Sequence, residues 1–239
     1  MFAEGGHPIV VAGAGDEASG AILLEALAAA PPYSTIYISG SFEVEGSVPL
    51  CVPLRLVGPV GATAQIRMER GALLVSALAF IERVAVVTWG PSPFNTDGTY
   101  DIERFCPAVE VTQRALCVLD SVHATSSIGT ALLVDEHARV FATGCALESS
   151  TGTTRKRAGQ LCLGVLGKRH SVLSMYGSRV SRCRWGAFGG AQAHASRLLE
   201  NNVFSGCVED IAHGDQYPDL TGQVVQPWGA WHGVAQTSL

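Results

Sequence analysis

Hydrophobic and polar residues alternate in short runs along most of the chain. Glycine, asparagine, aspartate or single charged residues separate these runs. Alternation with a period of two is typical of a strand with one buried face, and the separating residues are typical of tight corners. The sequence therefore predicts many short strands. The clearest runs are PAVEVTQ (107–113), ALCVLDSV (115–122), TALLVDE (130–136) and ARVFATG (138–144).

The runs recur about every 23 to 24 residues. Val180 matches Phe204 and Cys183 matches Cys207, each 24 residues apart. Three short strands per repeat at this period indicate the rungs of a solenoid, in which each rung buries its inner face against its neighbours. A leucine-rich repeat has a similar period, but its L-x-x-L-x-L-x-x-N pattern is absent from the sequence. Further matches are Cys117 with Val140, Ala108 with Ala131, Leu56 with Phe80, Leu163 with Ala187, Ala187 with Ile211 and, across insertions, Val84 with Val122 and Val140 with Val172.

One amphipathic helix is predicted over residues 16–32, before the first repeat. It has an acidic start, a double-proline stop, and apolar residues at Ile22, Leu23, Leu27 and Ala30. A strand that ends at Gly40 follows it. Among the repeats, Leu133 and Leu173 are expected to point into the lumen of the solenoid.

The segment after this helix resembles the opening of the pectate lyase-like β-helix superfamily. The pattern T-I-x-I-x-x-G-x-F-x-E is followed by L-x-L-x-G, and the matching residues are Thr35, Ile36, Ile38, Gly40, Phe42, Glu43, Leu54, Leu56 and Gly58. The resemblance implies an all-β, right-handed parallel β-helix with an N-terminal capping α-helix and an irregular C-terminal cap. We expect a single domain over 1–239. It comprises an N-terminal strand and capping helix (1–33), rungs (34–213) with insertions at 89–105 and 149–159, and a C-terminal cap or docking tail (214–239).

Composition agrees with a narrow solenoid and excludes several function classes. Hydrophobic residues make up 47% of the chain and charged residues 15%, with 27 glycines, which excludes extensive disorder. A net charge of −5 makes nucleic acid an unexpected partner. We expect no signal peptide or transmembrane segment, and hence an intracellular protein, cytoplasmic or cytoskeletal. Seven cysteines without a C-x-x-C pair predict buried thiols rather than disulfides or zinc ligands.

Candidate chemistry is confined to VEDIAHGD (208–215). Its carboxylates and imidazole are the residue types of acid–base catalysis or of a metal site, but the segment is read more simply as the last rung entering the C-terminal cap. Asp135 and Glu136 match Gly167 and Lys168 one repeat on, so acids do not stack there, whereas His170 and His194 are expected to stack. We expect no catalytic set, metal or cofactor, and enzymatic activity stays an open alternative. The candidate catalytic or metal-binding residues of VEDIAHGD under that alternative are Glu209, Asp210, His213 and Asp215.

Interaction surfaces are predicted at the two insertions and the C-terminal tail. Aromatic residues in the first insertion either fold back on the solenoid or contact a partner, because exposed aromatic side chains are costly. CASH-type intracellular β-helix repeats resemble this chain and act as recognition surfaces. The hypothesis is a non-catalytic scaffold in a larger assembly of proteins, with a cytoskeletal assembly as one candidate. The alternative is a carbohydrate-binding, polysaccharide lyase-like or glycoside hydrolase-like protein that uses a lateral groove. The candidate contact residues are Trp89, Phe94, Tyr100, Phe105, Arg155, Lys156, Arg157, Trp228 and Trp231.

Overall fold

The chain folds into parallel β-strands with one α-helix near its start. Within the described residues there are 21 strands and one helix, and the strand pairs are parallel, which confirms the predicted strand-rich class. The computed structural model describes residues 8–93, 105–112, 114–149, 163–168, 170–183, 185–189, 194–196, 201–207 and 209–212.

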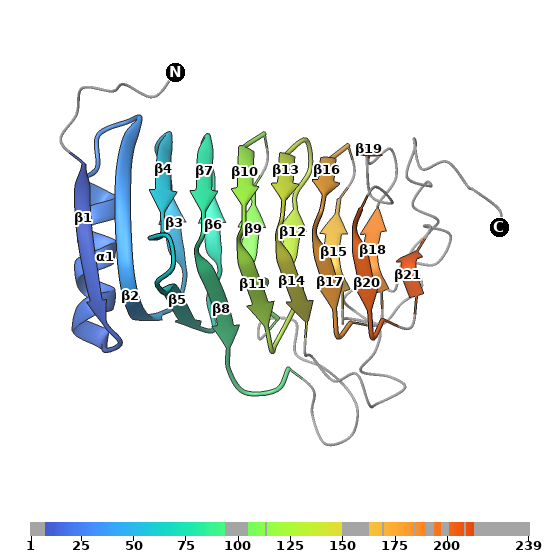
Figure 1. The fold of residues 1–239 in the computed structure, drawn as a ribbon, viewed down its shortest axis with the longest axis horizontal. Coiled ribbons are helices and arrows are strands. Elements are labelled where there is room, and N and C mark those ends of the chain that lie inside the picture. The colour runs from blue at the N-terminus through green and yellow to red at the C-terminus, as the bar shows by residue number, and fades with distance from the viewer. Residues whose placement is uncertain are drawn as a thin grey trace.

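The N-terminal segment contains β1 (Ile9–Ala14), α1 (Glu17–Ala29) and β2 (Ser34–Glu45). The Asp16 carboxylate accepts a hydrogen bond from the Ser19 backbone N–H at 2.8 Å, which satisfies one of the donors left unpaired in the first helical turn. The predicted helix is thereby confirmed. Its residues Leu23 and Leu27 are buried, but Ile22, expected on the same apolar stripe, is 52% exposed. The helix packs against β1 and β2 at one end of the molecule (Figure 1).

The long strand β2 belongs to two runs of strands at once. Its start pairs with β4 and its second half pairs with β5. The sequence predicts a strand that ends at Gly40, but the structure continues through it. Gly40 has a φ of 80°, a conformation that glycine adopts without a steric penalty, so the chain changes direction there without ending the strand.

Three columns of strands run along the molecule from β2. From β3 on, each strand pairs with the strand three places later, so the chain forms successive rungs, a topology consistent with a parallel solenoid (Figure 1). The first arm contains β4 (Leu54–Val57), β7 (Ala79–Glu82), β10 (Leu116–Asp120), β13 (Arg139–Thr143), β16 (Val172–Tyr176) and β19 (His194–Ser196). The second arm contains β5 (Ala64–Glu69), β8 (Ala85–Trp89), β11 (His123–Ser126), β14 (Ala146–Ser149), β17 (Arg179–Ser181) and β20 (Val203–Ser205). The separate smaller sheet contains β3 (Val48–Leu50), β6 (Leu73–Val75), β9 (Val109–Val111), β12 (Leu132–Val134), β15 (Leu163–Gly167), β18 (Trp185–Gly189) and β21 (Glu209–Ala212).

The predicted register is confirmed in some rungs. Val180 pairs with Phe204, and Ala187 pairs with Ile211. The match of Cys117 with Val140 is also correct.

Other rungs are shifted from the predicted register. Leu56 pairs with Ile81 rather than Phe80, and Val140 pairs with Leu173 rather than Val172. Each error is one residue, which exchanges the inner and outer faces of a strand. A third error, Leu163 pairing with Trp185 instead of Ala187, is two residues and preserves the face. The corners between strands differ in length from rung to rung, so a fixed period loses the register.

A continuous apolar core runs between the three columns. Leu173 is fully buried in this core, as predicted. Leu133 was expected in the lumen but lies beside Glu110 on the opposite side of its strand, while its neighbours Leu132 and Val134 belong to the core. Leu133 is nevertheless only 9% exposed. Apolar character therefore did not distinguish the inner from the outer position in β12.

Candidate binding face

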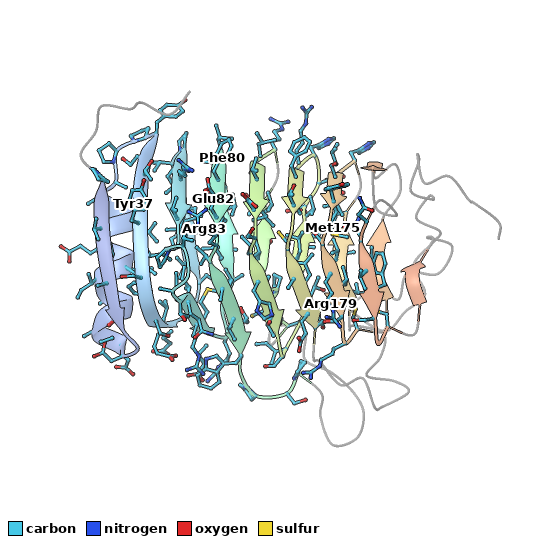
Figure 2. All side chains as sticks on the ribbon, in the orientation of Figure 1. Tyr37, Phe80, Glu82, Arg83, Met175 and Arg179 are labelled. Atoms are coloured by element: carbon cyan, nitrogen blue, oxygen red, sulfur yellow. The ribbon has the colours of Figure 1, made fainter. Side chains whose placement is uncertain are left out.

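The outer surface of the first arm, together with the first half of β2, carries a group of side chains in register, which we call the binding face. Because alternate residues of β4, β7, β10, β13 and β16 are buried in the core, the remaining residues point outward. Figure 2 labels Tyr37, Phe80 and Glu82 among them. The binding face comprises Tyr37, Arg55, Phe80, Glu82, Val118, Asp120, Phe141, Thr143 and Tyr176.

One row of this face is apolar. Phe80 pairs with Val118, which pairs with Phe141, so the three side chains stand beside one another on successive rungs. Phe141 is 44% exposed. Tyr37 on β2, which is 42% exposed, belongs to the neighbouring row, in register with Val57 and Glu82. Neighbouring strands are about 4.8 Å apart, so the row extends over about 10 Å. Exposed aromatic side chains in a row of this kind favour contact with another molecule.

An ion pair links this row to the next one, because Arg55 stands in register with Phe80, whereas Glu82 lies two residues further along β7. Arg55 donates from Nε to Glu82 Oε1 at 2.6 Å and from Nη2 to Oε2 at 2.9 Å. Arg83 Nη1 lies 3.4 Å from Glu82 Oε2. The hydrogen bonds from Arg55 hold the pKa of the Glu82 carboxyl below its ordinary value, against the opposing effect of burial. Glu82 is therefore ionised and engaged by two guanidinium groups.

Asp120 lies next to Glu82 on the adjacent rung, so two carboxylates are stacked in register. The Ser121 hydroxyl donates to Asp120 Oδ1 at 3.0 Å. This pair was not predicted from the sequence, although the match of Val84 with Val122 gives the correct offset. Two residues earlier in the chain, the same offset relates Glu82 to Asp120.

Two closely placed carboxylates are the residue types that glycoside hydrolysis requires, with one acting as a protonated acid. Glu82 does not suit that role, because the arginines favour its charged form.

A column of left-handed corners fixes the end of this face. Arg83 has a φ of 54° and Ser121 a φ of 55°. Gly144 and Gly177, at the equivalent corners of later rungs, also have a positive φ. The Arg83 backbone N–H donates to the Asp120 carbonyl at 2.9 Å, and the Ser121 N–H donates to the Thr143 carbonyl in the next rung. Glycine and single charged residues were predicted at such corners, as Gly144 and Arg83 illustrate, but Ser121 adopts the same conformation without having been predicted there. This corner places the Arg83 guanidinium beside Glu82.

The outer surface of the smaller sheet differs from the binding face. Glu110 on β9 stands in register between Leu74 and Leu133. Burial raises the pKa of the Glu110 carboxyl, and Lys168 partly offsets this effect. Lys168 Nζ also lies 3.0 Å from Asp135 Oδ1. The predicted match of Asp135 with Gly167 is therefore off by one residue, and the structure places a lysine beside this aspartate.

The structure places only some of the sequence-predicted site residues. Trp89 ends β8 and is 40% exposed, and Phe105 is partly buried ahead of β9. Glu209 and Asp210 are in β21, where their backbones alone are described. The remaining predicted residues lie outside the described part of the chain: Phe94, Tyr100, Arg155, Lys156, Arg157, His213, Asp215, Trp228 and Trp231.

The predicted stacking of His170 with His194 was wrong. His170 stacks on His137, with ring centroids 5.0 Å apart and planes 3° from parallel. His194 pairs in register with Val172 instead. No group of three or more His, Cys, Asp or Glu residues that could hold a metal ion is found in the described ranges.

No protein-family model matches the chain, and no curated protein matches it significantly. No helix in the described part of the chain is long and apolar enough to cross a membrane.

Proposed function

We propose that this protein is a non-catalytic scaffold whose binding face engages another protein of an intracellular assembly. The exposed apolar and aromatic residues of the binding face carry this proposal. Tyr37 and Phe141 expose large aromatic surfaces, and aromatic side chains are the residues that most often dominate protein interfaces. Arg55 and Glu82 beside them would supply a charged rim, which is the usual surrounding of an apolar contact.

The architecture proposed for this scaffold is a right-handed parallel β-helix, of the kind found in pectate lyase-like and CASH-type repeats. The pairing of each strand from β3 on with the strand three places later supports it. Helix α1 supports a capping role, because it packs against β1 and β2 at the start of the rungs. A cap there would cover apolar surface that an open solenoid end exposes.

Glu82 and Asp120 weigh against catalysis at the binding face. Acid catalysis needs a carboxyl group that holds its proton near neutral pH, and Arg55 acts on Glu82 in the opposite direction. The two carboxylates are better suited to recognise donors on a partner. A cytoskeletal setting is part of the proposal by analogy with CASH-type repeats alone.

Carbohydrate binding is the second candidate function. Flat aromatic rings beside carboxylates also suit a sugar, whose apolar ring face stacks on the aromatic and whose hydroxyls donate to the acids. Phe80 and Phe141, two rungs apart next to Glu82 and Asp120, provide that combination. The two candidates place the contact on the same face, so an experiment must distinguish the ligands.

The test compares Phe141→Asp with Val203→Asp as a matched control. Val203 is 55% exposed but lies on β20 in the second arm, away from the binding face. Tagged chains are expressed in their native cells and isolated by affinity. We expect stoichiometric recovery of a partner protein with the unaltered chain and with Val203→Asp, and at least a tenfold loss with Phe141→Asp. Circular dichroism checks that both variants keep the strand content.

Three results would contradict the proposal. Equal partner recovery with Phe141→Asp would place the contact elsewhere, and deletion of residues 89–105 would then test the first insertion. Retention of the purified chain on neutral or acidic polysaccharide gels, lost in Phe141→Asp, would favour carbohydrate binding. Depolymerisation of polyuronates that is abolished by Asp120→Ala or Asp210→Ala would make the protein an enzyme.

A further inference from the structure

Two cysteines lie in contact just after two paired strands of the second arm. Cys183 Sγ is 3.1 Å from Cys207 Sγ. The two residues follow β17 and β20, which pair through Val180 with Phe204. The pairing continues beyond the strands, because the Arg182 N–H donates to the Ser205 carbonyl at 3.3 Å. The cysteines therefore occupy equivalent positions on adjacent rungs.

This placement fits a disulfide without movement of the backbone. Neighbouring strands are about 4.8 Å apart, and disulfides join Cα atoms separated by about 4.4–6.8 Å. The two sulfur atoms are already in contact, so forming the bond requires them to approach each other by about 1 Å. The structure contains both residues as thiols.

Access to the pair is one-sided. Cys183 is 1% exposed, whereas Cys207 is only partly buried. A reagent from solution would therefore meet Cys207 first, with Cys183 behind it. A reactive thiol with a second thiol within reach is the usual arrangement of a redox-sensitive pair.

Other cysteines have different surroundings. Cys117 and Cys145 are buried, and burial raises the pKa of both thiols, that of Cys145 to about 11. Their thiolates are scarce at neutral pH and their side chains are out of reach of a dissolved reagent, so direct reaction with an oxidant is disfavoured, whereas Cys183 needs to react only with Cys207 beside it. Cys51 is exposed and provides a reference for simple thiol reactivity.

We propose that Cys183 and Cys207 form a redox modification site, which a small-molecule disulfide converts reversibly into a covalent link between adjacent rungs. The Cys207 thiolate attacks one sulfur of the reagent, forms a mixed disulfide and expels one thiol. The Cys183 thiolate then attacks Cys207 Sγ, which forms the Cys183–Cys207 bond and expels the second thiol. The protein loses two electrons and two protons, and the reagent is reduced to two thiols.

The test titrates the purified full chain with oxidised glutathione. Unreacted thiols are then alkylated, and peptides are analysed by mass spectrometry without reduction. We expect a Cys183–Cys207 cross-linked peptide that has lost two hydrogen atoms, at an oxidant concentration where Cys51 carries a glutathione adduct. Dithiothreitol should restore both thiols. The melting temperature of the oxidised chain should exceed that of the reduced chain, because the link constrains the unfolded state.

Single substitutions make the result specific. In Cys183→Ser, Cys207 should stop at the glutathione adduct, and in Cys207→Ser, Cys183 should stay reduced. Cys51→Ser is the matched control and should form the link as the unaltered chain does. Absence of the link when Cys51 is fully modified, or a link between other cysteines, would overturn the proposal. A melting temperature that oxidation does not raise would show that the link distorts the rungs, contrary to the geometry above.

Discussion

The outer surfaces of the first arm and of the smaller sheet follow the same strand alternation but have different exposure. On the first arm, the outward Phe141 is 44% exposed, and Glu82 is ionised and paired with Arg55. On the smaller sheet, the outward Leu133 is 9% exposed, and burial raises the pKa of its neighbour Glu110. An outward position in a rung is therefore not the same as a solvated one. Of these two surfaces, the first arm is the one that exposes apolar side chains to a partner.

The largest expected effect is a difference in the free energy of unfolding between a variant of the smaller sheet and a variant of the first arm. Leu133→Ala should lower the free energy of unfolding by about 2 kcal/mol or more, because it removes a buried side chain. Phe141→Ala removes a more exposed side chain and should cost less than about 1 kcal/mol. Urea unfolding of both variants measures this difference. Equal losses would mean that the two surfaces are equally buried, and the comparison would fail.

A smaller effect concerns the ion pair of the first arm. Since the pKa of Glu82 is lowered in the folded protein, its stabilising contribution is present above the pKa of the unfolded chain and is lost as pH falls through the folded pKa. Glu82→Gln should cost about 0.5–1 kcal/mol at pH 7, and the difference should vanish in acid. Urea unfolding at several pH values measures it.

Glu69→Gln is the control for this prediction. Glu69 makes a longer contact with Arg70, at 3.4 Å, and is more exposed. A pH-independent difference between the unaltered chain and Glu82→Gln would contradict the role assigned to Arg55.

The smallest effect has the opposite sign and belongs to the smaller sheet. The pKa of Glu110 is raised, so the folded state favours its protonated form, and that contribution is complete below the unfolded pKa and is lost as pH rises through the folded pKa. Glu110→Gln removes the buried charge and should stabilise the protein by about 0.5 kcal/mol at pH 7, with no gain in acid. Thermal unfolding across the same pH range checks this. Glu136→Gln serves as the control, and destabilisation by Glu110→Gln at pH 7 would contradict the assignment.

The sequence predicted the repeating parts of the molecule better than the parts that vary. The strand class, the helix and the contact of Cys183 with Cys207 could be predicted, because stacked core positions repeat the same chemistry. Register was lost by one residue between Leu56 and its neighbour Ile81, since the corners between strands vary in length. An error of that size reverses the two faces, so Phe80 was matched with a core leucine.

The binding face could not be recognised as a repeat. Its side chains change from Arg55 to Phe80, Val118 and Phe141 on successive rungs, and no periodic pattern links them. Stability favours similar residues in the core, but it places no such demand on the solvent side. Leu133 illustrates the converse problem. Its apolar side chain indicates that the position is buried, but it does not indicate which side of the strand faces the core.

The unequal spacing of the rungs has a consequence for changing this protein by design. Between β8 and β11 the chain is much longer than between β11 and β14, yet Thr125 pairs in register with both Val87 and Glu148. The position of a side chain on the surface is thus independent of how much chain separates two rungs. Foreign peptides inserted at such a junction would add a displayed segment and leave the surface pattern intact. The same property lets natural variation lengthen one junction while selection preserves the composition of the face beside it.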